Sequence, residues 1–71
     1  MDAELLDPTN LTPGWHITIM VTGMMGTYTA LVTSAKDRYG WCEVVVEKPI
    51  ESVLCGVTLR CEDYIPMEYI T

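Results

Sequence analysis

The chain has 71 residues, 49% of them hydrophobic and only 20% charged, which excludes a disordered segment and leaves room for one small domain. Ten acidic and four basic residues give a net charge of −6, which disfavours direct binding to nucleic acid or to an anionic membrane. No apolar run approaches the roughly 20 residues of a membrane-spanning helix, and the first four residues lack the basic start of a signal peptide. We therefore expect a soluble cytoplasmic protein.

The three cysteines, Cys42, Cys55 and Cys61, argue against both a disulfide framework and a zinc site. Their number is odd, none forms a Cys-x-x-Cys pair, and the single histidine, His16, lies far upstream. We expect them to act as small apolar fillers of the core. The sequence predicts neither a metal nor another cofactor.

Residues 1–14 are expected to form an acidic N-terminal arm, and residues 15–71 the domain itself. Residues 12–14 predict a tight turn, because Pro13 presets φ at the first central position and Gly14 accepts a positive φ at the second. The arm contains the carboxylates of Asp2, Glu4 and Asp7. Two leucines, Leu5 and Leu6, are expected to dock the arm on the domain.

From Trp15 the apolar side chains alternate, which predicts short strands over residues 15–22, 28–35 and 41–47. Between the second and third strands, residues 36–40 have the length and composition of a hairpin loop with Gly40 in the left-handed region. The predicted inward-facing residues of the three strands are Trp15, Ile17, Ile19, Val21, Tyr28, Ala30, Val32, Cys42, Val44 and Val46.

After Pro49, which cannot donate to a strand ladder, the alternation resumes over residues 57–62. Val57, Leu59 and Cys61 are expected to face inward there. Residues 63–66 then predict one 3₁₀ turn, and residues 67–70 a short closing strand.

Five short antiparallel strands predict an all-β, SH3-like small barrel, because curling the sheet buries its apolar face and removes most exposed edge. Residues 63–70 resemble the segment that ends many eukaryotic SH3 domains, where an aromatic-aliphatic-proline turn leads into a Tyr-Val strand. The chain lacks the Ala-Leu-Tyr-Asp-type first strand of that family and the acidic loop that follows it. An OB-like barrel is the structural alternative, although residues 49–56 are barely long enough for its helix.

The resemblance implies an aromatic surface groove that binds an extended, polyproline-type partner segment. Its expected lining is Trp41, Tyr64, Pro66 and Tyr69; the alternative is that Trp41 and Tyr69 are partly buried barrel residues. A second apolar surface is expected in the loop after the first strand, where Met24 and Met25 follow the outward-facing Met20. This surface would contact a partner or a second copy of the chain in a homo-oligomer.

The predicted function is a non-catalytic protein-interaction module. The carboxylates fall at tail, turn or outward strand positions, His16 is expected to be an isolated surface histidine, and residues 23–27 lack the lysine and helix of a phosphate-binding loop. Two alternatives remain open. One is an acidic phage or mobile-element inhibitor that occupies the basic site of a nucleic-acid-handling enzyme. The other is an oligomeric small-ligand binder or enzyme whose site lies between subunits.

Overall fold

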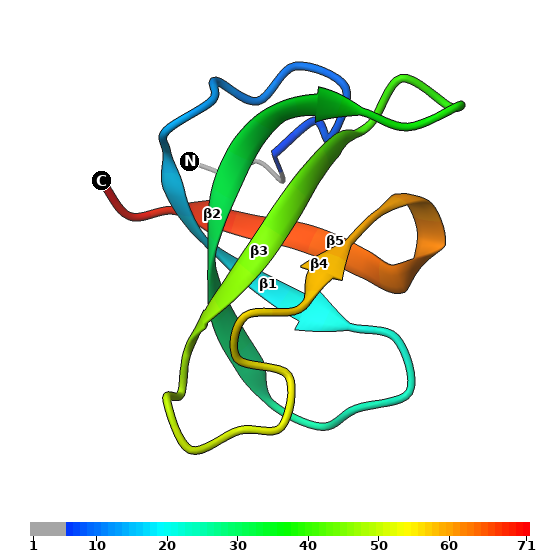
Figure 1. The fold of residues 1–71 in the computed structure, drawn as a ribbon. Helices are drawn as coiled ribbons and strands as arrows, with labels where there is room; N and C mark the ends of the chain where they lie inside the picture. Colours follow the sequence, from blue (N-terminus) through cyan, green and yellow to red (C-terminus); the bar gives the residue numbers. More distant parts are fainter. Residues whose placement is uncertain (1–5) are drawn as a thin grey trace, which may run out of the picture.

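A computed structural model describes residues 6–71 as a five-stranded antiparallel sheet that curls around one apolar core (Figure 1). The order across the sheet is β4-β3-β2-β1-β5, so β4 and β5 are its edges. The predicted all-β fold, with five antiparallel strands and a 3₁₀ turn before the last, is confirmed. Its elements are β1 (His16–Val21), β2 (Thr27–Lys36), β3 (Cys42–Lys48), β4 (Thr58–Leu59), the 3₁₀ helix η1 (Cys61–Asp63) and β5 (Tyr64–Tyr69).

Most of the core is built by the side chains that the alternating pattern placed inward; Val57, which was also expected to face inward, is 38% exposed. Successive residues of a strand point to opposite faces, so every second side chain of β1, β2 and β3 enters the interior. Burial of this apolar surface is the main stabilising contribution, at roughly 25 cal/mol per Å² removed from water. The most deeply buried members are Ile17, Ile19, Ala30, Val32, Val44 and Val46.

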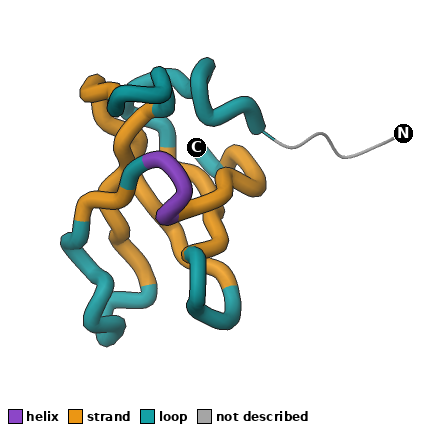
Figure 2. Tube along the Cα trace, turned by 90° about the vertical axis from the view of Figure 1, so that its right-hand side faces the viewer, coloured by secondary structure: helices purple, strands orange, loops and turns teal. Residues whose placement is uncertain are grey.

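The long strand β2 connects the two halves of the sheet, because it pairs with β1 through residues 27–31 and with β3 through residues 29–36. The β2–β3 register shifts between Thr29 and Ala30 and again between Val32 and Lys36. Irregularities of this kind bend a strand and increase its twist, which suits the curled sheet. The connecting loops gather at the two ends of the barrel (Figure 2).

The C-terminal part differs from the prediction in its boundaries. β4 spans only Thr58–Leu59, η1 begins at Cys61, and residues 64–66 belong to β5 rather than to the turn. The N–H group of Cys61 donates to Oδ2 of Asp37 at 2.7 Å, and the residue has a φ of 48°. A contact with a distant loop thus accompanies the end of the strand at Leu59 instead of residue 62, although Cys61 still faces inward as expected.

Residues 6–14 lie against the barrel. Leu11 is only 6% exposed and belongs to the core, and Leu6 packs against the core as expected. The N–H group of Cys42 donates to the carbonyl of Pro8 at 2.9 Å. Gly14 has a φ of 96°, and the N–H group of Trp15 donates to the carbonyl of Thr12 at 3.1 Å, which confirms the predicted turn. The expectations for Asp2, Glu4 and Leu5 fall outside the described residues.

Within residues 6–71, helix is limited to the three residues of η1, and no helix there is long and apolar enough to cross a membrane.

Candidate functional site

The residues of β5 contradict the predicted aromatic groove. Tyr64 is 0% exposed, and its hydroxyl donates to the carbonyl of Cys42 inside the barrel. Pro66 is also buried, opposite Ile19 of β1. The expectation that Tyr64 and Pro66 line a surface groove is therefore wrong. Its cause is the early start of β5, which turns residues 64 and 66 inward and leaves Ile65 outside.

Trp41 and Tyr69 also lie apart, because each pairs with a different aromatic ring. Trp41 is partly buried and meets Tyr64 edge to face, with ring centroids 5.9 Å apart. Tyr69 is 54% exposed and meets Trp15 in the same manner at 4.8 Å. The four predicted groove residues thus belong to two separate aromatic pairs. Trp15, which the prediction treated as an inward strand residue only, completes the second pair.

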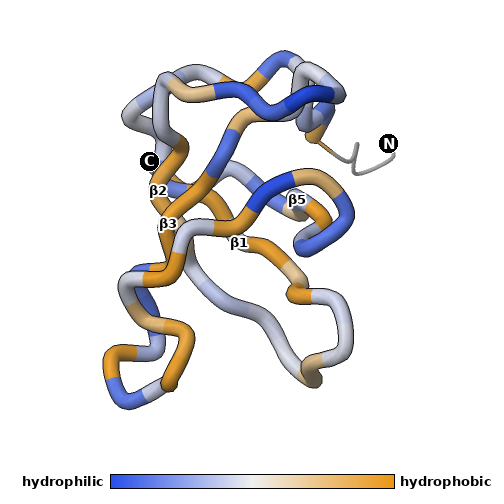
Figure 3. The backbone as a smooth tube through the Cα atoms, turned by 45° about the vertical axis from the view of Figure 1, so that its right-hand side comes forward, coloured by the Kyte–Doolittle hydropathy of each residue, from blue (hydrophilic) through white to orange (hydrophobic). Residues whose placement is uncertain are grey.

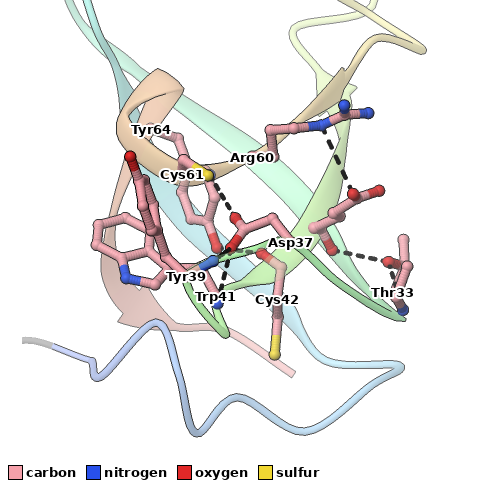
Figure 4. A network of polar contacts seen from close by, with 10 residues as sticks. Thr33, Asp37, Tyr39, Trp41, Cys42, Arg60, Cys61 and Tyr64 are labelled. Carbon is pink, nitrogen blue, oxygen red and sulfur yellow. Dashed lines mark hydrogen bonds and ion pairs between the residues drawn. The ribbon is translucent and has the colours of Figure 1, made fainter.

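Asp37 organises the loop between β2 and β3 around its carboxylate (Figure 4). Oδ1 accepts the N–H groups of Tyr39 at 2.8 Å and Trp41 at 3.0 Å, and Oδ2 accepts that of Cys61. Partial burial raises the pKa of Asp37, but hydrogen bonds from Cys61, Tyr39 and Trp41 outweigh it and hold the pKa below its ordinary value. Asp37 therefore acts as a fixed anionic acceptor that joins the loop to η1.

A cavity of about 370 Å³ lies beside this network. Burial, followed by the hydrogen bond to Asp37, raises the pKa of the Cys61 thiol to about 11, so the thiol is protonated at neutral pH and is a poor nucleophile. Nε of Arg60 lies 3.5 Å from Oε2 of Glu43. At this cavity Arg60 thus pairs with Glu43, and Asp37 is held by backbone N–H groups. Its lining is Asp37, Arg38, Glu43, Arg60, Cys61, Glu62 and Asp63.

His16 is not the isolated histidine that was expected. Its Nδ1 lies 2.8 Å from Oε1 of Glu47, across the outer face of the sheet from β1 to β3. The pair borders a second cavity of about 460 Å³ that Thr29 and Lys48 also line. The outward position of both residues on their strands was visible in the sequence, but their proximity depends on strand order. Within residues 6–71, no group of three or more His, Cys, Asp or Glu side chains is placed to hold a metal ion.

The predicted exposure of Met24 and Met25 is confirmed, and the structure adds neighbours to them. Met20 and Ile65 are direct partners in the β1–β5 register, and both side chains are exposed. The loop that follows β1, at the lower right of Figure 3, contains Met24 and Met25. Met25 is 95% exposed. We call Met20, Met24, Met25 and Ile65 the methionine patch. The prediction missed Ile65 because it assigned this residue to a turn.

Carboxylates border the methionine patch. Thr22 donates its N–H group to the carbonyl of Asp63 at 2.9 Å and its hydroxyl to the carbonyl of Glu62, so η1 lies against the exit of β1. Glu68 of β5 is the register partner of Thr18. The side chains of Glu62, Asp63 and Glu68 are exposed. Among residues 6–71 the ion pairs are His16–Glu47 and Arg60–Glu43, so these three carboxylates have no cationic partner there.

The loop of residues 49–57 exposes a second apolar set at the same end of the barrel (Figure 1). Ile50 is 76% and Val53 is 87% exposed, whereas Leu54 packs against the core and anchors the loop. The sequence analysis did not identify these residues, because they lie in a segment without periodicity.

Comparison with known proteins gave no match: no protein-family model, no curated protein and no solved structure is significantly similar to this chain. The geometry of its own surfaces is therefore the basis for a functional proposal.

Proposed function

We propose that this protein is a non-catalytic interaction module that binds a segment of a partner protein through the methionine patch. The observation that carries the proposal is the exposure of four large apolar side chains at the exit of β1, with Met25 at 95%. Apolar surface gathered in this way is characteristic of contact sites. Unbranched thioethers also adapt their shape to a partner better than branched side chains do.

The patch rests on a firmly held support, which favours binding. Met20 and Ile65 project from paired strands, and Thr22 joins the start of the loop to η1. The N–H group of Met24 donates to the carbonyl of Val21 at 3.0 Å and closes the turn. Contact residues that are already in place lose less conformational entropy when a partner binds.

Two features support a non-catalytic role. The cavity beside η1 contains a thiol whose raised pKa keeps it protonated, Arg60 pairs with Glu43, and Asp37 is bound by backbone N–H groups. The other cavity has one histidine, His16, and its Nδ1 is engaged in a hydrogen bond with Glu47.

The test is the selection of binding peptides from a random library displayed on phage, with the immobilised protein as target. We expect enriched peptides that lose affinity roughly tenfold with Ile65→Ser or Met25→Ser, since truncating a central apolar contact costs about 1–2 kcal/mol of binding. Val53→Ser removes an equally exposed apolar side chain from the neighbouring loop and is the matched control. Circular dichroism would establish that each variant is folded.

The proposal fails if no peptide is enriched, or if enriched peptides bind the Ile65→Ser and Met25→Ser variants as tightly as the unchanged protein.

A further inference from the structure

We infer that the segment bound by the methionine patch is cationic and amphipathic, with lysine or arginine side chains flanking an apolar face. This inference rests on the proposed function and adds the chemistry of the partner. It follows from the net negative charge beside the patch.

The acidic side of the patch is formed by η1 and β5. Glu62 and Asp63 are adjacent residues of η1. Their backbone carbonyls accept both hydrogen bonds of Thr22, which lies between Met20 and Met24 in the chain. Glu68 extends the acidic border along β5 beyond Ile65. Apolar contact and exposed anionic charge therefore occur together on this surface.

Two of the four basic residues, Lys36 and Lys48, have their contacts away from the patch, whereas Arg38 and Arg60 line the cavity that Glu62 and Asp63 also line. Lys36 donates to the carbonyl of Thr9 at 3.0 Å, and the guanidinium of Arg38 lies over the ring of Tyr39 at 5.1 Å. Lys48 lines the His16 cavity, and Arg60 pairs with Glu43. Neither arginine forms an ion pair with Glu62 or Asp63 within residues 6–71, and the cavity they share holds four carboxylates against these two cations, so the border keeps a net negative charge.

This arrangement favours cationic partner segments over anionic ones. Unpaired carboxylates beside an apolar surface repel anionic segments and attract cationic ones, which raises the association rate and disfavours wrong partners. An amphipathic segment satisfies both halves of the surface, because its apolar side chains cover the methionines while its cations meet Glu62 and Asp63.

The closing experiment compares two synthetic peptides by isothermal titration calorimetry. One is an amphipathic leucine–lysine peptide of about four helical turns, and the other has glutamate in place of each lysine. We expect the lysine peptide to bind at least about tenfold more tightly, and to lose affinity in 0.5 M salt because exposed charges are screened. Glu62→Gln and Asp63→Asn are each expected to weaken binding about threefold. Glu51→Gln removes the same charge from the loop of residues 49–57 and is expected to leave binding unchanged.

Each contrary outcome separates this inference from the proposed function. Equal binding of both peptides, weakened by Ile65→Ser, would overturn the cationic partner and leave the interaction surface supported. Equal weakening by Glu51→Gln and Glu62→Gln, with no effect of Ile65→Ser, would mean diffuse attraction to an acidic protein and would also overturn it. Failure of both peptides to bind would reject the inference, while the library selection would still decide the proposed function.

Discussion

The two ends of the barrel differ in whether the apolar side chains of their loops are buried or exposed. At one end, residues 6–14 and the loop of residues 37–41 place apolar side chains inside, with Leu11 in the core and Trp41 against Tyr64. At the other end, the loops of residues 22–26 and 49–57 present Met25 and Val53 to solvent. We call these the closed end and the open end.

The difference lies in what satisfies the loop backbone. At the closed end the Asp37 carboxylate accepts three N–H groups and binds the loop to η1. At the open end the loop ends are tied to neighbouring elements by backbone hydrogen bonds from Thr22 to Asp63 and from Gly56 to Val46, and no side-chain carboxylate of residues 6–71 holds the loop tips, which turn on local bonds such as that from Met24 to Val21. Apart from Leu54, which packs against the core, the apolar side chains of these loops are exposed. We therefore expect the closed end to contribute more to stability, which leaves the open end available for binding.

Of the substitutions that test this difference between the ends, Leu11→Ala is expected to change the free energy of unfolding most. Removing a buried leucine leaves a cavity and should lower the free energy of unfolding by about 3 kcal/mol. Val53→Ala at the open end should change it by less than about 0.5 kcal/mol. Urea denaturation measures both. Similar losses for the two variants would show that the ends do not differ in their contribution to stability.

Tyr64→Phe is expected to lower the free energy of unfolding by a smaller amount. This change leaves the ring in place but removes the hydroxyl that donates to the carbonyl of Cys42 in the core, which should cost about 1–2 kcal/mol. Tyr39→Phe is the matched control, because that ring is half exposed and its hydroxyl makes no hydrogen bond within residues 6–71. If thermal unfolding shows no difference between the two variants, the buried hydrogen bond contributes nothing.

The Asp37 network adds a dependence on pH. Because the folded pKa of Asp37 is lowered from 3.8, its stabilising contribution is present above about pH 4 and is lost as the pH falls through the folded pKa. We expect Asp37→Asn to reduce the melting temperature near neutral pH and to flatten its decline on acidification below pH 4. Parallel profiles for the variant and the unchanged protein would contradict this role of the carboxylate.

The smallest perturbation is the alkylation of thiols in the folded protein. Cys55 is exposed in the open-end loop, whereas Cys42 and Cys61 are buried at or near the closed end, and the raised pKa of Cys61 further slows its reaction. Brief treatment with iodoacetamide at pH 8 should give a single adduct, on Cys55. Modification of all three cysteines at similar rates, read by mass spectrometry, would mean that the closed end opens readily.

The strands were predictable where one face is buried and the other is wet. In β1 and β3 the alternation of Ile17 with Ile19, and of Val44 with Val46, specified both the strand and its inner face. The turns at Gly14 and Gly40 were equally readable, because few residues other than glycine adopt a positive φ. The boundary between β4 and η1 could not be predicted, because it depends on the hydrogen bond from Cys61 to Asp37, a residue distant in sequence.

The sequence alone determined that this chain is all-β, most of the side chains that form its core, and that Met24 and Met25 are exposed, because these properties follow from local alternation and turn composition. Tertiary structure decided that Tyr64 and Pro66 are buried, that His16 meets Glu47, and that Ile65 lies beside Met20. Each of these depends on strand order or on register, where a shift of a single residue reverses the face to which a side chain points.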